Sequence, residues 1–414
     1  MTARGATLNR NRLPRWVNAG IDAIADAPMS PLGRLAARRM GKPAPRGSVP
    51  ETRFEPRGRR VLITPVNYSG QATAWARALE ASAPDLSARS AAVDVPGGFS
   101  FPANTVIPVG TYHNDPEWQR RQFEAAAGAT HVLIEAEEPP FGRMLGRSVE
   151  TQARALRDRG VAVAFMAHGT DVRLPSRHLR GNPWSHYGDS EIYAPRYEAL
   201  AARNIALLER FGAPVFVSTP DLLLDLPDAT WCPVVVDPER WDVRDDSGRG
   251  ARLRVAHAPS VGAVKGTELI LPLLERLEAE GVIAVNLVRG VPSARMPEVF
   301  AAADVVIDQL RIGSYGVAAC EAMAAGAVVV GHVSETVRGL VAERTGRELP
   351  IVEATPDSLE GVLRELAAAQ DLGPQVAEGR DFVREVHDGR RSARALLDHW
   401  IDDRPDGGPR ASDR

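Results

Sequence analysis

Short runs of β-branched and apolar residues alternate with longer helical patterns from Arg60 onward, and this alternation limits the fold more than any other feature. Such alternation is typical of parallel strands that are covered by helices. The first series of expected strands covers 61–66, 105–110, 131–136, 161–167 and 214–219, and the second covers 253–260, 282–288, 304–310, 327–332 and 350–354. The sequence therefore predicts an α/β protein.

The alternation is interrupted at 232–252, where CPVVVD leads into the polar stretch PERWDVRDDSGRGAR. A chain of 414 residues is long enough for two hydrophobic cores. We therefore expect a basic extension at 1–59, Rossmann-like doubly wound domains at 60–232 and 233–381, a helical segment at 382–402 and a disordered tail at 403–414. Ligands of such sheets bind outside the carboxyl ends of the strands, so the cleft between two facing domains is the expected site.

Bulk composition is that of a soluble protein, with 44% hydrophobic and 25% charged residues. No apolar run approaches the roughly 20 residues that span a bilayer. Cys232 and Cys320 both stand in apolar stretches, so we expect core residues and a cytoplasmic location. The amino terminus lacks the apolar core of a secretory signal. The arginine- and alanine-rich composition suggests a bacterial source.

Positive charge is concentrated at the amino terminus, where residues 1–60 contain 13 Lys and Arg against 4 Asp and Glu. Apolar residues recur there at helical spacing, namely Leu13, Trp16, Val17, Ile21 and Ile24. An amphipathic helix beside arginines can rest on an anionic membrane. The alternatives are that the segment packs on the protein or is disordered. Prolines and glycines make 41–59 resemble a linker.

The segment GSYGVAACEAMAAG, from Gly313 to Gly326, connects two expected strands through a turn and a helix. Gly313 and Gly316 allow a tight turn, and the free amides that open the helix offer a positive dipole end to a diphosphate. Glu321 lies about 7 Å into the helix at roughly 1.5 Å per residue. A carboxylate there is placed to accept hydrogen bonds from a ribose. The alternative is an exposed Glu321, or one paired with an arginine.

This segment resembles the donor-binding signature of family four of the retaining glycosyltransferases, which have the GT-B fold. Glu321, Ala322, Met323 and Gly326 match the second half of the signature. The family has a first glutamate where this chain has Gly313, and that glutamate is taken to hold hydroxyls of the donor sugar. The resemblance implies two domains facing across a cleft, a final segment that crosses back to the first domain, and catalysis without a metal or other cofactor. The residues that it assigns to the nucleotide-sugar donor here are Gly313, Ser314, Tyr315, Gly316, Val317 and Glu321.

A second match lies at 257–270, where a strand ends and Lys265-Gly266 opens a helix. In the family this lysine and a nearby arginine neutralise the donor diphosphate, whose leaving phosphate carries negative charge. Lys265 fits this role. The expected arginine is absent from 259–264, so the second positive charge is missing or comes from Arg289 or Arg311.

AFMAHGTDVRLPSRH, at 164–178, places His168 directly after an expected strand and resembles the family's H-G-x-D segment. The resemblance implies that His168 orients the donor sugar, while Asp171 and Arg173 arrange the loop or contact the acceptor. The alternative is a histidine that only caps the strand. Ser69 and Gly70 follow the first strand and are further candidates on the acceptor and sugar side.

Two acidic clusters are not assigned to chemistry. EAEEPP, at 135–140, is interpreted as a solvated loop, and DVRDD, at 242–246, is not interpreted as a metal site. We therefore predict no metal and no nucleic-acid partner.

The expected function is transfer of a hexose from a nucleoside diphosphate sugar to an acceptor hydroxyl, with His168, Lys265 and Glu321 as the catalytic residues. Two alternatives remain: a nucleotide-sugar epimerase of the same fold, and a non-catalytic binding or partner protein. The base, the sugar and the acceptor are not specified by the sequence.

Overall fold

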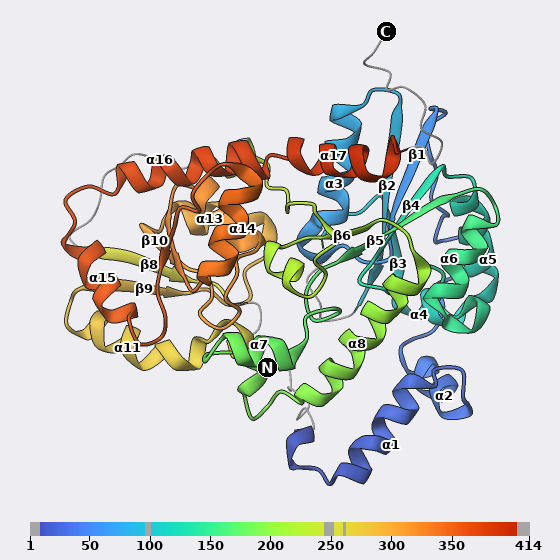
Figure 1. The fold of residues 1–414 in the computed structure, drawn as a ribbon, viewed down its shortest axis with the longest axis horizontal. Coiled ribbons are helices and arrows are strands. Elements are labelled where there is room, and N and C mark those ends of the chain that lie inside the picture. Colours follow the sequence, from blue (N-terminus) through green and yellow to red (C-terminus); the bar gives the residue numbers. More distant parts are fainter. Residues whose placement is uncertain (1–8, 96–100, 244–251, 260–261, 404–414) are drawn as a thin grey trace.

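The computed structural model describes residues 9–95, 101–243, 252–259 and 262–403. These residues form two parallel sheets, each with its own helices, and Figure 1 shows the two groups side by side. None of the helices within these ranges has the length and apolar character needed to cross a membrane. The chain is therefore α/β with two doubly wound domains, as the alternation predicts.

The first domain contains a parallel sheet in the order β3-β2-β1-β4-β5-β6-β7. Its elements are β1 (Arg59–Thr64), α3 (Gln71–Ser82), β2 (Leu86–Asp94), β3 (Thr105–Pro108), α4 (Val109–Asn114), α5 (Pro116–Ala127), β4 (His131–Glu135), α6 (Val149–Arg157), β5 (Ala162–Ala167), α7 (Pro175–Gly181), α8 (Ala194–Phe211), β6 (Val215–Val217) and β7 (Thr230–Trp231). The strand order reverses between β1 and β4, so their carboxyl ends form the place where ligands of such sheets bind.

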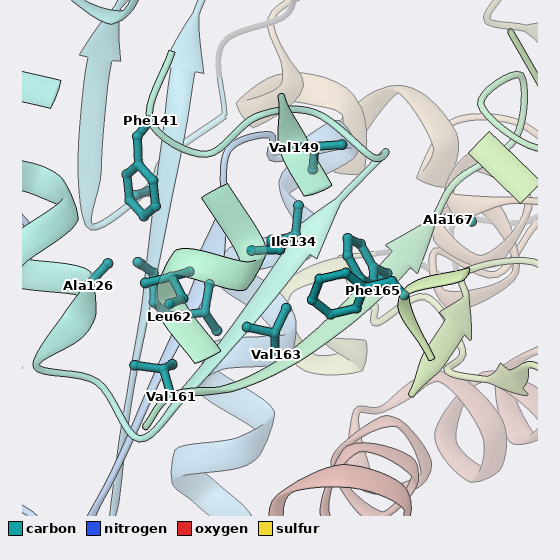
Figure 2. Close-up of a cluster of buried hydrophobic side chains, with 14 of the residues drawn as sticks. Leu62, Ala126, Ile134, Phe141, Val149, Val161, Val163, Phe165 and Ala167 are labelled. Carbon is teal, nitrogen blue, oxygen red and sulfur yellow. The ribbon is translucent and has the colours of Figure 1, made fainter. Parts of the chain in front are cut away.

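Both faces of this sheet are buried. Leu62, Ile134 and Phe165 project to one side and pack with Phe141 from the loop after β4, as Figure 2 shows. On the other side, Val61 and the strand residues beside it pack against α3 and the end of the chain. A strand covered on both faces consists mostly of apolar residues, which explains why β1, β4 and β5 are recognisable in the sequence.

β2 is the strand that the sequence pattern does not reveal. Its residues, LSARSAAVD, are mostly small, and Ala and Ser do not favour strands. It lies between β1 and β3 and packs against α3, where Ser90 Oγ is 2.8 Å from Thr73 Oγ1. The small side chains leave room for α3, so tertiary packing determines this strand where intrinsic propensity does not.

The second domain contains a parallel sheet in the order β12-β11-β10-β8-β9. Its elements are α9 (Pro238–Trp241), β8 (Leu253–His257), α10 (Gly262–Lys265), α11 (Thr267–Ala279), β9 (Ile283–Leu287), α12 (Met296–Ala301), β10 (Val305–Ile307), α13 (Val317–Ala324), β11 (Val328–Gly331), α14 (Glu335–Thr345), β12 (Ile351–Glu353), α15 (Leu359–Ala368) and α16 (Gly373–Phe382). All five expected strands are present. Here the order reverses between β8 and β10.

The chain passes between the domains twice, after β7 and again after α16. The second passage runs through the π-helical turn η7 (Val383–His387) into α17 (Arg390–Leu396) and η8 (Leu397–Ile401). The end of the chain packs on the first domain, where Leu396 and Trp400 join the cluster that contains Trp75 of α3. The two passages are bonded to each other, because Val236 N donates to His387 O over 2.8 Å.

The basic extension forms α1 (Arg15–Asp26) and α2 (Pro31–Arg39), which Figure 1 shows beside α8 and below α4. The following proline-rich stretch is irregular, but it is docked and is not a free linker. Ala44 N donates to Thr111 Oγ1 over 2.9 Å, and the buried Thr52 N donates to Gln122 Oε1 over 2.9 Å. Local turn residues indicate irregular backbone, but they do not show whether it packs.

Candidate functional site

The carboxyl ends of β8 and β10 bring Lys265 and Asp308 together. Lys265 ends α10 in the loop after β8, and Asp308 directly follows β10. Lys265 Nζ lies 2.5 Å from Asp308 Oδ1, and both side chains are largely buried. The backbone also joins the two loops, because Leu310 N donates to Lys265 O over 3.2 Å. The lysine therefore lies at the topological switch point of the sheet, the position expected of a ligand-binding cation.

A single side chain organises the turn after β10. Gln309 Oε1 accepts from Arg311 N over 3.0 Å and from Ile312 N over 2.6 Å. Gln309 Nε2 donates to His332 O over 2.8 Å and to Ser314 O. This buried amide fixes the turn before α13, and the sequence analysis did not identify it because a glutamine after a strand has no distinctive pattern.

Gly313 lies in this turn with a φ of 72°. A residue with a side chain is strained at that φ, and an added Cβ would lie 3.3 Å from Asn182 Nδ2 of the first domain. The departure from the family's first glutamate thus has a local cause, because the backbone here suits glycine.

The amino terminus of α13 faces the cleft. Gly316 is its N-cap in an extended conformation, and no side chain caps the helix. The first helical residues, Val317 and Ala318, line the larger of the two cavities described below. Uncapped amides at a helix start provide donors and a positive dipole for an anion.

Glu321 lies one turn further along α13, and its carboxylate has no hydrogen-bond partner in the described part of the chain. Burial raises its pKa to about 8; Arg240 and Lys265 oppose this rise, and Asp308 adds to it. It borders the larger cavity. Glu321 is thus half-buried beside the cavity and accepts no hydrogen bond from an arginine among the described residues, so its carboxylate oxygens remain available as acceptors.

His168 follows β5 and has a defined orientation. Its Nε2 lies 3.1 Å from Oε1 of the fully buried Glu135, and its ring contacts Tyr68 and Trp75 at centroid distances of 5.2 and 5.8 Å. Burial raises the pKa of Glu135, while the bond to His168 lowers it. The carboxylate behind the imidazole fixes the ring, as in other carboxylate–histidine pairs.

Asp171 and Arg173 hold the loop after His168. The Asp171 carboxylate accepts from the backbone N–H groups of His168, over 2.8 Å, and Gly169. Arg173 donates twice to Oδ2 of the buried Asp221, over 3.0 and 2.6 Å. This geometry corresponds to the loop-arranging role, and contact of either residue with an acceptor stays a prediction.

The interpretation of EAEEPP as a solvated loop is wrong. Glu135 and Glu137 are buried, and Ala136 and Glu137 have φ values of 55° and 49°. The pKa of Glu137 is raised well above 4.5, first by burial and then by Asp171 and Glu138. These acids lie at the carboxyl end of β4, beside the switch point of the first sheet. Their position directly after a buried strand was the available signal.

Two cavities meet in the cleft between the domains. The larger has a volume of about 720 Å³ and the smaller about 380 Å³, and each is lined from both domains. Tyr68, Ser69, Lys265 and Val317 border both. A ligand that extends from one cavity into the other therefore passes Lys265 and the start of α13.

Most of the predicted site residues border these cavities. The larger is lined by Ser69, Lys265, Arg289, Val317 and Glu321, and the smaller by Ser69, His168, Asp171, Arg173, Lys265, Ser314, Tyr315, Gly316 and Val317. Gly313 and Gly70 line neither. Gly70, with a φ of 77°, is the N-cap of α3, so it forms the backbone turn that begins this helix.

Of the two arginines considered for the diphosphate, Arg311 is engaged elsewhere. Its Nη1 lies 2.7 Å from Asp189 Oδ2 and 3.0 Å from Ala263 O, and its Nε donates to Trp184 O over 3.1 Å. It therefore joins the domains. Arg289 is exposed in the loop after β9 and lines the larger cavity, so it stays the candidate.

No group of three or more side chains suited to a metal occurs in the described ranges. Asp242, the first acid of DVRDD, pairs with Arg380 at 3.0 Å, whereas 244–246 lie outside the described residues. Cys232 and Cys320 are free and buried.

Comparison with known proteins identifies the architecture. No family model and no curated protein matches the sequence. Among solved structures, sucrose-phosphate synthase from Thermosynechococcus elongatus aligns with a TM-score of 0.51 at 14% identity, over 82% of this chain and 98% of that one. HepE from Anabaena, in complex with UDP and glucose, aligns with a TM-score of 0.53 at 10% identity over the same shares. An alpha-glucosyltransferase in complex with UDP gives 0.51 at 10%, again over 82% and 98%.

The chain has the GT-B fold. At these identities the likeness is one of fold. Lys265 lies at the switch point of the second sheet, and His168 follows β5, the strand beside β4 in the first sheet.

Proposed function

We propose that this GT-B chain is a retaining glycosyltransferase of the family-four type, which transfers a hexose from a nucleoside diphosphate sugar to an acceptor hydroxyl without a metal. One observation carries the proposal. Lys265, the uncapped start of α13 and the unpartnered Glu321 border one continuous cleft, with His168 on its opposite side. A cation, free amides and a carboxylate in that order match a diphosphate followed by a ribose.

In this proposal the diphosphate lies between Lys265 and the amides at 316–318. The ribose hydroxyls donate to Glu321, and the donor sugar enters the smaller cavity, where His168 contacts a hydroxyl. Arg289 supplies a second positive charge. Lys265 exchanges Asp308 for phosphate when the donor binds, and the loop at 313–316 covers the sugar.

The reaction requires no nucleophile from the protein. The bond between the anomeric carbon and the phosphate oxygen breaks, the acceptor oxygen forms a bond on the same face, and the acceptor proton passes to the leaving phosphate. Lys265 and the amides stabilise the negative charge on that phosphate, and the sites on both domains hold the reactants in position.

The extent of the larger cavity favours transfer over epimerisation. It continues past the donor residues into the first domain as far as Val106 and Tyr112, which leaves room for a second substrate. An epimerase needs no such space. Isomerisation of a nucleotide sugar without an acceptor would favour that alternative, and failure of every nucleotide sugar to raise the Tm would favour a non-catalytic protein.

Site variants test the donor assignment. Lys265→Ala and Glu321→Ala should each weaken binding of UDP or ADP about 10- to 100-fold, because a hydrogen bond to a charged group contributes roughly 1.5–3 kcal/mol. Calorimetric titration measures this. Glu343→Ala, an exposed carboxylate on α14, is the matched control. Unchanged binding in both site variants would contradict the assignment.

We also propose a cytoplasmic location with peripheral membrane contact through the basic extension.

A further inference from the structure

The first-domain half of the larger cavity is lined mostly by hydrocarbon. Its apolar residues are Met40, Val66, Val93, Val95, Phe101, Val106, Val109 and Tyr112. Val95 and Val106 are 56% and 49% exposed, although β-branched residues usually lie buried in strands. An acceptor made only of sugar would leave its hydroxyls without partners here, whereas a hydrocarbon group would cover this surface.

Four polar residues in this half, Asn67, His113, Glu138 and Arg147, interact with other groups of the protein. Arg147 Nη1 donates to His113 Nδ1 over 2.8 Å, and Glu138 lies 3.7 Å from Arg147. Burial and the nearby arginine lower the pKa of His113 to about 4, so it is neutral and able to accept that bond. Asn67 Nδ2 donates to Pro102 O over 3.0 Å. Hydrocarbon is therefore the main surface that this part of the cavity offers a ligand, beside the polar side chains of Tyr68, Ser69 and Asp94.

The amino-terminal extension forms part of the same cavity. Met40, the C-cap of α2, lines it and is 51% exposed. Asn114 of α4 fixes this end of the extension by donating to Ala37 O and Gly41 O over 2.9 and 3.0 Å. At Gly110 of α4 an added Cβ would lie 2.2 Å from the backbone oxygen of Lys42, so α4 and the segment after α2 are in close contact.

The acids of helix α1 are engaged in ion pairs, whereas two of its large apolar side chains, Trp16 and Ile24, are exposed to solvent. Its acids point toward the protein, where Asp22 pairs with Arg10 at 2.9 Å and Asp26 pairs with Arg196 and Arg203 of α8 at 2.8 and 3.0 Å. Several large apolar side chains of the extension are exposed, while Leu13, Val17 and Ile21 are half-buried. Trp16 is 78% exposed, and the others that are exposed are Ile24, Leu32, Leu35 and Met40.

Positive charge surrounds these outward apolar residues. The exposed basic residues at 9–46 are Arg12, Arg15, Arg34, Arg38, Arg39, Lys42 and Arg46, and both acids at 9–46 are engaged in ion pairs. An apolar face with arginines around it is complementary to an anionic lipid surface, where hydrocarbon inserts and headgroups pair with the cations.

We propose that the acceptor is an amphiphile drawn from an anionic membrane: the outward face of α1 and α2 rests on the lipid, and the apolar half of the cavity takes the hydrocarbon next to the acceptor hydroxyl. The hydroxyl then lies where the two cavities meet, beside Lys265 and Ser69. This inference rests on the proposed function, because it names the acceptor class of the same site.

Vesicle flotation of the full chain tests the membrane surface. The protein should float with vesicles of phosphatidylcholine and phosphatidylglycerol, and much less with phosphatidylcholine alone. Replacing Arg34, Arg38 and Arg39 together by Gln should weaken binding about a hundredfold, at roughly fivefold per charge. Leu35→Glu should also weaken it, whereas Leu269→Glu, equally exposed on α11, should not. Equal flotation with both lipids, or of all variants, would overturn the proposal.

Ligand binding tests the cavity. Octyl glucoside below its micellar concentration should raise the Tm, methyl glucoside should not, and Val106→Asp on the edge strand should abolish the shift. Equal responses to both glucosides would overturn the proposal, as would octyl glucoside binding without vesicle binding, which would indicate a soluble hydrophobic acceptor. UDP binding by the same variants is measured separately, so a failed donor site is distinguishable from a wrong acceptor class.

Discussion

Glu321 is the one ionisable carboxylate on the otherwise apolar helix α13. It is an acid on a helix of alanines, and burial of a carboxylate without a partner is unfavourable. The same burial gives the folded protein a measurable dependence on pH.

Glu321→Gln should stabilise the protein increasingly as pH rises. The pKa of Glu321 is about 8 in the folded chain against an ordinary 4.5, so the native state holds a proton that the unfolded state has lost. The contribution of this group to the free energy of unfolding is therefore lost as pH rises from about 4.5 to about 8. Gln does not titrate and so avoids that loss. The Tm difference between variant and wild type should grow through this window and level off above it.

Thermal unfolding at a series of pH values measures the effect. Glu343→Gln, which changes an exposed acid, should show no such trend. A Tm difference that is constant from pH 5 to 9 would show that Glu321 is not the buried acid described above.

At the scale of elements, the turn between β10 and α13 is where this chain departs from the signature that its sequence resembles. The turn is set by Gln309 and by the left-handed Gly313, and Asn182 of the first domain lies against it. The family's first glutamate does not fit this backbone without strain. In the proposed donor complex, the sugar would therefore be held by the other residues of the smaller cavity.

Gly313→Ala should destabilise the protein by about 1–2 kcal/mol, because a left-handed conformation costs a residue with a Cβ roughly that much. The matched control is Gly339→Ala within α14, where an added Cβ meets nothing within 4 Å. That substitution should stabilise by about 0.5–1 kcal/mol. Tm and urea titration measure both, and equal effects of the two substitutions would contradict the account of the turn.

Strands with strong apolar character could be predicted, whereas those determined by packing could not. The valine-rich β10 and β11 are evident in the sequence, but β2 contains mostly Ala and Ser, and β7 has only two residues. Lys265, Glu321 and His168 were found because each stands at a fixed place relative to a strand or helix. Gln309 and the buried state of Glu137 depend on contacts distant in sequence, which no local pattern encodes.

At the scale of the molecule, the loop of the first domain at 178–189 holds the turn of the second. His178 Nε2 lies 2.8 Å from Ile312 O, and Asn182 donates to Arg311 O over 2.9 Å. The Arg311–Asp189 ion pair adds a charged contact between the domains. These bonds keep the two halves of the candidate site in register.

Arg311→Ala should loosen the closed arrangement. It removes several charged hydrogen bonds between the domains, each contributing roughly 1.5–3 kcal/mol, so the radius of gyration in small-angle scattering should increase. Arg276→Ala, which breaks an exposed ion pair within the second domain, should leave the scattering unchanged. Identical curves for all three proteins would mean that other contacts hold the cleft closed.

The double passage between the domains has a mechanical consequence. Val236 and His387 join the two passages at one place. Sliding of one domain along the other would therefore break that bond, whereas rotation about that place would not. Relative motion that keeps this bond is thereby limited to rotation about this place. A ligand that contacts both sheets would restrict that rotation, so in the proposed mechanism donor binding would also set the width of the space left for an acceptor.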